Sequence, residues 1–216
     1  MKGTHIPAAP LRSLVLAGGA SSRMGMDKAL LSYEGVPQLR RVAGLLSEVA
    51  PPVFVSVRAG QAAGPHLDGL RLLPDQDAGI GPLEGLLAAF REASDCAWLV
   101  VAVDMPFLTA ETLTRLVEAR DPSASATAYR NPETDRPEPV CAIYEPSILP
   151  VLIRAKEERR YSLMLLRDVP VRLVEPHRPE ELRNINDPAE YREAVTKNRP
   201  LPGELPGGRG EEGRTR

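Results

Sequence analysis

The chain has 216 residues, of which 43% are hydrophobic and 26% are charged, and its formal net charge is −2 at neutral pH. This length and apolar content fit one large domain with a sizeable core, and the near-neutral charge gives no reason to expect a nucleic-acid-binding protein, which usually carries clustered basic residues. No run approaches the roughly 18 apolar residues of a membrane span, and the first residues lack the apolar centre of a signal peptide, so we expect a cytoplasmic protein with no membrane partner.

The first predicted element is a buried strand at residues 13–17 (SLVLA), which the paired glycines Gly18 and Gly19 end abruptly. Glycines have no Cβ atom, so they adopt positive φ readily and let main-chain N–H groups approach a ligand closely. The end of the strand, Leu16 and Ala17, and the two glycines therefore form a candidate anion-binding turn.

Two cations follow this turn in the segment LAGGASSRMGMDK, residues 16–28. Arg23 offers a planar guanidinium for phosphate oxygens, and Lys28 offers a mobile point charge. The spacing matches neither a P-loop nor a dinucleotide-binding fingerprint. The alternative interpretation is a glycine-rich surface turn beside a solvated arginine and lysine.

Apolar runs and helical periodicity then alternate along the chain, with Thr109 as a candidate N-cap of one helix. Further strands are expected at residues 53–57, 70–73 and 97–103, and helices at residues 39–50, 83–90 and 112–119. This alternation predicts an α/β fold with three layers and a mostly parallel, mixed central sheet in a single domain.

The second half is less regular, and strands at 124–129 and 140–144 are expected to flank a proline-rich, charged loop at 130–139 that lies over the site. Helices at 148–158 and 162–167 and a strand at 171–174 should follow. Asp187 and Pro188 are suited to begin a last helix that runs to about Lys197. Residues 198–216 are rich in proline, glycine and charge, so we predict a disordered tail there.

Asp104 follows the most continuously hydrophobic predicted strand, at the edge where open α/β sheets bind ligands. Mg²⁺ prefers oxygen ligands and usually takes only one or two protein carboxylates alongside phosphate oxygens and water, which makes Asp104 the candidate metal ligand. The alternative is a turn residue, with Pro106 as helix punctuation. Cys96 and Cys141 lie in apolar runs and are expected to be reduced core residues rather than a metal site.

Four further polar side chains are candidates for a site. Asp75 follows a predicted strand at the same edge, although Asp is also common in plain turns. Asn184 and Asn186 flank Ile185, so an extended backbone points both amides to one side, although Asn also occurs in turns before helix caps. Arg160 belongs to a local positive cluster, for which a solvated helix end is the alternative.

Four motifs occur in an order that resembles a known family. They are LAGG with SxRMG and DK, then GPLEG (81–85), VDMPF (103–107) and NINDP (184–188). The set is similar to that of the nucleotidyltransferases that make nucleotide-activated sugars, alcohols and cofactors, and most similar to the molybdenum cofactor guanylyltransferase family. The resemblance covers residues 11–197 and implies a Rossmann-like nucleotidyltransferase domain there.

The resemblance implies an enzyme that transfers GMP from GTP to the phosphate of Mo-molybdopterin, releases pyrophosphate and forms the guanine dinucleotide form of the cofactor. GTP and Mo-molybdopterin are then the substrates, Mg²⁺ the cofactor, and other molybdenum cofactor maturation proteins the further partners. It assigns catalysis to Arg23, Lys28 and Asp104, with Asp104 as metal ligand. It assigns nucleotide binding to Leu16, Ala17, Gly18, Gly19, Lys28, Asp75 and Asp104, and acceptor binding to Asn184, Asn186 and Arg160.

The choice of nucleotide rests on a finer comparison. LAGG, in place of the LAAG of cytidylyl-transferring relatives, favours GTP on the hypothesis that Gly19 leaves room for a purine. Relatives often have Asn at the end of the second strand, where this chain has Ser56, so base contacts at that position are in doubt. The alternatives are a CTP-using molybdopterin cytidylyltransferase or a sugar- or alcohol-phosphate nucleotidyltransferase of the same fold, and, more distantly, a non-catalytic nucleotide- or cofactor-binding module.

Overall fold

The structure is a computed structural model, and it describes residues 8–17, 31–33, 35–58, 64, 66–77, 79–185 and 189–190. The predicted tail at 198–216 and most of the predicted helix at 187–197 lie outside these residues. Within the described ranges, no helix has the length and apolar character needed to cross a membrane.

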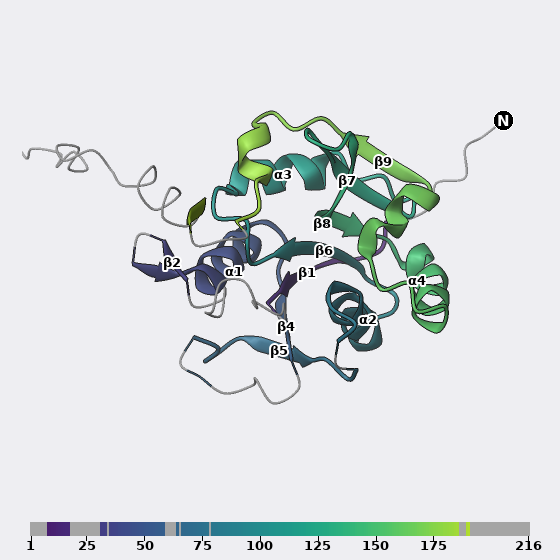
Figure 1. Ribbon diagram of the computed structural model, residues 1–216, viewed down its shortest axis with the longest axis horizontal. Coiled ribbons are helices and arrows are strands. Elements are labelled where there is room, and N and C mark those ends of the chain that lie inside the picture. The colour runs from purple at the N-terminus through teal and green to yellow at the C-terminus, as the bar shows by residue number, and fades with distance from the viewer. Residues whose placement is uncertain are drawn as a thin grey trace, which may run out of the picture.

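A seven-stranded sheet with the order β5-β4-β1-β6-β8-β7-β9 forms the centre of the fold (Figure 1). Its strands are β1 (Leu11–Leu16), β4 (Val53–Val57), β5 (Arg71–Pro74), β6 (Ala97–Ala102), β7 (Ala126–Asn131), β8 (Arg136–Tyr144) and β9 (Val171–Val174). Neighbouring strands pair in parallel except at β8, which is antiparallel to both β6 and β7. A small antiparallel pair, β2 (Ser32–Tyr33) and β3 (Val36–Pro37), lies outside this sheet. The predicted mostly parallel, mixed sheet is confirmed.

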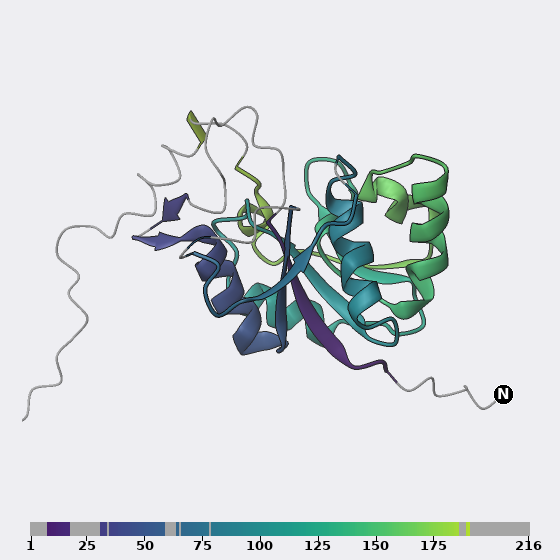
Figure 2. The same cartoon turned by 90° about the horizontal axis from the view of Figure 1, so that it is seen from below.

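Helices cover both faces of the sheet. They are α1 (Gln38–Val49), α2 (Pro82–Glu92), α3 (Ala110–Glu118) and α4 (Leu149–Glu157), with 3₁₀ turns η2 (Pro146–Ile148), η3 (Leu163–Asp168) and η4 (Pro179–Leu182). Side chains of α1 and α3 contribute to the core on one face, and those of α2, α4 and η3 contribute to the core on the other. Figure 2 shows α1 on one side of the sheet and α2 with α4 on the opposite side. The three-layer prediction is therefore confirmed.

Strand β6, AWLVVA, is buried along its whole length because both of its faces are covered. Leu99 and Val101 belong to the core beneath α1 and α3, whereas Trp98 and Val100 belong to the core beneath α2 and α4. Because side chains on both faces of the strand are buried, its sequence is a continuous run of apolar residues. Cys96 and Cys141 are buried free thiols, as predicted.

The prediction of a loop at residues 130–139 is wrong. Strand β8 begins at Arg136, so this segment is an antiparallel hairpin with a turn at residues 132–135. Its prolines suggested a loop because proline lacks the N–H that a sheet ladder needs. The pairing with β7 shifts register between Ala128 and Arg130, opposite Pro139, and such irregularities are where sheets accommodate proline.

A buried ion pair joins the end of α3 to the end of β8. Arg120 donates from Nε to Glu145 Oε1 (2.6 Å) and from Nη2 to Glu145 Oε2 (2.9 Å), and the two side chains are only 11% and 3% exposed. Arg120 Nη2 also donates to the carbonyl oxygen of Ala9 (2.8 Å). The Arg120 guanidinium therefore connects the segment before β1 to the residue that follows β8.

We expect Arg120→Met to lower the free energy of unfolding by about 3 to 5 kcal/mol, because it leaves the Glu145 carboxylate buried without its cation. Urea denaturation followed by circular dichroism measures the change. Arg115→Met is the matched control, since Arg115 is half-exposed and pairs with an exposed acid, Glu111, one helical turn away. An equal loss in both variants would contradict the special role of the buried pair.

Candidate active site

The carboxyl ends of four parallel strands, in the order β5-β4-β1-β6, meet at one edge of the sheet. The chain turns from β1 toward β4, whereas β6 lies on the other side of β1, so the strand order reverses between β1 and β6. Open α/β sheets bind ligands at such a reversal. At this edge, main-chain hydrogen bonds connect the end of β1 to the ends of both neighbouring strands. Val103 N donates to Leu16 O and Ala17 N donates to Ser56 O, both at 3.2 Å.

The structure thus places Leu16 and Ala17 at the centre of this edge, between the ends of β4 and β6. The other residues predicted for the phosphate turn and its cations lie outside the described part of the chain, as does one residue predicted for the acceptor. They are Gly18, Gly19, Arg23, Lys28 and Asn186. Their roles stay predictions.

Asp104 lies two residues beyond β6, and the structure brings Asn184 next to it. Ile185 N donates to Asp104 O (2.8 Å). The segment that contains Asn184 therefore lies beside the turn that follows β6. Asp104 Oδ1 and Asn184 Oδ1 are both buried, and the Asn184 oxygen has no hydrogen-bond partner within the described residues. Two side-chain oxygen donors at this place suit a hard cation such as Mg²⁺.

The described ranges contain no cluster of three or more His, Cys, Asp or Glu side chains that could hold a metal by themselves. A cation beside Asp104 would therefore take most of its ligands from elsewhere. That is the usual situation of Mg²⁺ bound together with a nucleotide, where phosphate oxygens and water complete the coordination.

The Asn184 segment is anchored by an acidic residue that sequence reasoning missed. Glu181 is buried, and its Oε2 accepts hydrogen bonds from Thr109 Oγ1 (2.8 Å) and Thr112 Oγ1 in the first turn of α3. A carboxylate is favourable there because the N-terminus of a helix carries positive partial charge. Thr109 also caps α3, as predicted, by accepting a hydrogen bond from Thr112 N.

Asp75 lies directly after β5 at the same edge. Ser56 Oγ donates to Asp75 Oδ1 (3.0 Å), and Asp75 N donates to Val57 O (2.8 Å). Burial raises the pKa of Asp75, while the Ser56 hydrogen bond opposes the shift. Ser56 thus orients this carboxylate.

Asp75 and Asp104 mark the two sides of the edge. Strands β4 and β1 separate β5 from β6, so three strand spacings, or about 14 Å, lie between the ends that carry the two carboxylates. Leu16 and Ala17 lie between them. An elongated ligand laid along this edge would meet all three places.

The second glycine of the GPLEG motif has a packing role. A Cβ atom on Gly85 would lie 2.6 Å from Ser56 Oγ and 2.7 Å from Leu16 Cδ2. Helix α2 therefore approaches the ends of β1 and β4 more closely than any other residue would allow at this position. Gly81, which precedes α2, has a φ of 69°, a conformation that favours glycine.

Glu138 is a second buried carboxylate near Asp104. Pairing of β6 with β8 joins Val101 to Cys141, and continuing this antiparallel register by three residues places Glu138 opposite Asp104. Glu138 accepts hydrogen bonds from Asn131 Nδ2 (2.7 Å) and Val140 N (3.3 Å). Burial is the main cause of its raised pKa, and the charge of Asp104 adds to it.

The structure does not join Arg160 to Asn184. Arg160 follows the end of α4, and its Nε donates to Glu158 Oε2 (2.8 Å) with the side chain 52% exposed. The alternative interpretation of a solvated helix end describes this position, and a role for Arg160 toward an acceptor stays a prediction.

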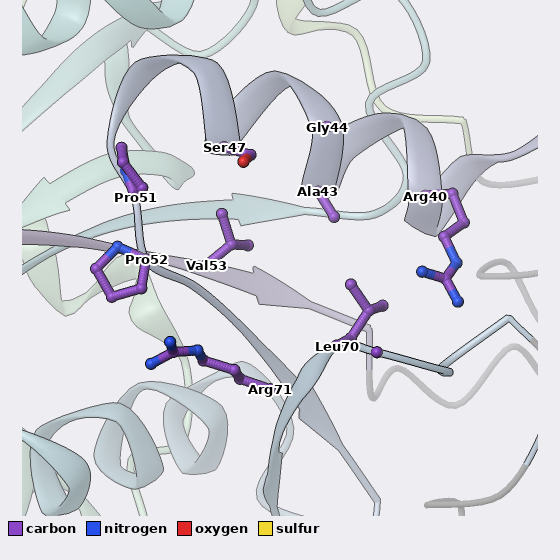
Figure 3. Close-up of a pocket in the computed structure, with 10 residues that line it drawn as sticks. Arg40, Ala43, Gly44, Ser47, Pro51, Pro52, Val53, Leu70 and Arg71 are labelled. Carbon is purple, nitrogen blue, oxygen red and sulfur yellow. The ribbon is translucent and has the colours of Figure 1, made fainter.

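A separate surface hollow of about 520 Å³ lies between α1 and the segment that leads into β5 (Figure 3). Figure 3 shows Arg40 and Arg71 on different sides of it. Arg40 donates to Asp68 O (2.6 Å), and the Arg71 guanidinium lies over the Phe54 ring at 5.6 Å. Both cations thus have partners in the protein, and the hollow reaches Pro51 and Pro52 at the amino end of β4, away from the edge described above.

Comparisons with known proteins agree with this geometry. Residues 13–173 match the family described as MobA-like NTP transferase domain. A molybdenum cofactor biosynthesis bifunctional protein from Synechocystis is 32% identical over 183 residues, which are 84% of this chain and 53% of that protein. The chain thus spans about half the length of this relative.

Two further proteins are similar over most of their length. A probable molybdenum cofactor guanylyltransferase from Deinococcus radiodurans is 34% identical over 186 residues, which cover 85% of this chain and 93% of that protein. The crystal structure of molybdopterin-guanine dinucleotide biosynthesis protein A from Archaeoglobus fulgidus is 25% identical, with a TM-score of 0.70 over 86% of this chain and 97% of the other.

We expect Gly85→Ala to lower the free energy of unfolding by about 1 to 3 kcal/mol, because the new methyl group must displace Ser56 or Leu16. Gly44→Ala in α1 is the control. A Cβ atom at Gly44 meets nothing within 4 Å, so removing a helical glycine there should raise the stability by about 0.5 to 1 kcal/mol. Urea denaturation of both variants measures the changes, and a stabilising Gly85→Ala would refute the packing role.

Glu138 predicts a pH dependence of stability. Its pKa in the folded protein is raised above the ordinary value of 4.5, so its protonated form favours folding, and this contribution is lost as the pH rises through the raised value. Glu138→Gln removes the titration. The stability of the variant relative to wild type should therefore increase between about pH 4 and pH 7, as measured by thermal unfolding at each pH. A difference that does not change with pH would contradict the assignment.

Proposed function

The chain belongs to the family of MobA-like NTP transferase domains, which confirms the resemblance drawn from its four motifs, and on that premise we propose that it transfers GMP from GTP to the phosphate of Mo-molybdopterin. The products are pyrophosphate and the guanine dinucleotide form of the cofactor. The observation that carries the proposal is the position of Asp104 and Asn184 beside the exit of β1. The names of the relatives support the choice of GTP and of a molybdopterin acceptor.

The reaction needs no covalent enzyme intermediate. An oxygen of the acceptor phosphate attacks the α-phosphorus of GTP, and the bond from the α-phosphorus to the bridging oxygen of the β-phosphate breaks. The acceptor phosphate is already a competent nucleophile. Catalysis therefore consists of aligning the two substrates in line and neutralising the negative charge that gathers on the α-phosphate and the leaving pyrophosphate.

The edge of the sheet provides places for the parts of GTP. Asp75 is suited to the nucleoside end because its carboxylate is held by Ser56 and lies about three strand spacings from Asp104. We assign the phosphates to Leu16 and Ala17, which lie between the two carboxylates, and to Gly18 and Gly19. We assign the binding of the triphosphate charge to Arg23 and Lys28.

The residues beside the exit of β1 fit a Mg²⁺ ion. Asp104 would hold it, and Asn184 adds a buried side-chain oxygen that has no other partner within the described residues. When bound, such an ion neutralises charge on the α-phosphate and the leaving group. The segment that bears Asn184 thus lies beside Asp104, which suits the binding of an acceptor phosphate next to the metal ion.

We further propose that Asn184, Asn186 and Arg160 bind the acceptor, and that the protein works in the cytoplasm with other molybdenum cofactor maturation proteins. Arg160 would have to leave Glu158 to reach an acceptor phosphate. Residues 11–197 form the proposed catalytic domain.

The test of the function is pyrophosphate release with Mg²⁺, molybdate-loaded molybdopterin and GTP, CTP, ATP or UTP in parallel. We expect release with GTP alone. Release with CTP alone would identify the reaction as cytidylyl transfer. Activity only with a sugar or alcohol phosphate as acceptor would refute the proposal that the acceptor is a pterin. No pyrophosphate release with any nucleotide or acceptor would indicate a non-catalytic binding module.

The same assay tests the residue roles. Asp104→Ala and Lys28→Ala should each lower the rate by about 10² to 10³, because each removes one electrostatic contact to the reacting phosphates, and both should stay folded. Asp95→Ala is the matched control, since Asp95 is an exposed acid at the opposite end of β6. A rate near that of wild type in either test variant would overturn its assignment.

A further inference from the structure

A further acidic residue, Glu84, is fully buried on α2 and accepts hydrogen bonds from three donors. Glu84 Oε1 accepts from Arg91 Nη2 (2.5 Å) and from Gln76 N (3.3 Å), and Glu84 Oε2 accepts from Lys156 Nζ (3.2 Å). The side chain is 0% exposed. The donors come from α2 itself, from the turn after β5 and from α4, so one carboxylate joins three parts of the fold.

Lys156 extends the cluster to the next residue of the turn. Its Nζ also donates to Asp77 Oδ2 (2.5 Å), and this contact raises the pKa of Lys156 and lowers that of Asp77. Two carboxylates and two cations therefore balance within the cluster. Only Glu84 is buried among these four side chains, since Arg91 and Lys156 are 36% and 31% exposed and Asp77 is 52% exposed. Burying a paired carboxylate adds little stability compared with an apolar side chain of the same volume, so stability alone does not account for Glu84.

The cluster holds the backbone on the carboxyl side of Asp75. Asp75 N donates to Val57 O, Gln76 N donates to Glu84, and the Asp77 side chain pairs with Lys156. Three consecutive residues are thus tied to three different elements, namely β4, α2 and α4. The Asp75 carboxylate, which Ser56 orients, has a fixed position as a result.

We propose that Glu84 and Lys156 are positioning residues for the nucleotide. They hold the turn at residues 75–77 so that the Asp75 carboxylate is in place before the nucleotide arrives. This inference rests on the proposed function, because it takes Asp75 as a nucleotide-binding residue. Neither Glu84 nor Lys156 touches the nucleotide itself in this account.

Pre-organisation sets the expected size of the effect. If the turn is not held, binding must order its residues, and fixing one backbone residue costs enough free energy to weaken affinity by about tenfold. Loss of the cluster should therefore appear as weaker GTP binding and a higher KM. The rate at saturating substrate should change less, because the groups assigned to the reacting phosphates remain.

The experiment compares Glu84→Gln and Lys156→Met with Arg154→Met as control. Arg154 lies two residues before Lys156 on α4, is 75% exposed and pairs with Glu158, so its loss leaves the turn untouched. Isothermal titration measures the affinity for GTP with Mg²⁺, and hydrogen exchange measures protection of the Gln76 amide in the free protein. Both are carried out well below the unfolding temperature of every variant.

We expect about tenfold weaker GTP binding and faster exchange of the Gln76 amide in Glu84→Gln and Lys156→Met, and wild-type values in Arg154→Met. Lys156→Arg should restore part of the affinity, because it keeps a cation in reach of Asp77 and Glu84. Wild-type affinity in both test variants would overturn the inference. If the wild-type protein takes up no GTP, the proposed function fails, and unchanged protection of Gln76 in Glu84→Gln would then overturn the inference independently.

Discussion

The parallel pairing of β1 with β6 is the constraint on which the site depends. Their register runs from Leu11 opposite Ala97 to Leu16 opposite Ala102, so both strands end at the same level. The chain leaves β1 at Ala17 and reaches Asp104 two residues beyond β6, and the two exits are neighbours for this reason. A slip of one residue would turn every side chain of one strand to the other face and bring Trp98 out of its core.

The acidic groups along this edge are stabilised in different ways. Asp75 and Glu138 accept hydrogen bonds from neutral side chains, Ser56 and Asn131, and burial raises the pKa of both. Glu84 instead pairs with two cations, Arg91 and Lys156. Hydrogen bonds from neutral groups hold a carboxylate in place without cancelling its charge. Asp75 therefore keeps its negative character toward a ligand, whereas the charge of Glu84 is used within the protein.

Much of the fold followed from local patterns, because strands covered on both faces are continuous apolar runs and helices have an apolar stripe. The position of Asp75 and Asp104 at one edge could be predicted because the carboxyl ends of parallel strands meet there, whatever the order of the strands. Glu138 was missed, since its position depends on the register of β8 against β6, and the prolines on either side of it suggested a loop. Glu84 was missed because Lys156 lies 72 residues away in the sequence, and no local pattern predicts that contact.

The residues that anchor the site come from the less regular second half of the chain. Lys156 on α4 holds the turn that bears Asp75, and Glu181 on η4 holds the segment that bears Asn184 against α3. The motif predicted to bind phosphate, residues 16–28, lies in the first half of the chain. The turn that bears Asp75 and the segment that bears Asn184, in contrast, are held by residues of the second half. A fragment that ended at Phe107 would keep the LAGG, GPLEG and VDMPF motifs, yet it would lack both anchors. The family match, which continues through residue 173, includes the first of these anchors and is consistent with a site built by the whole sheet.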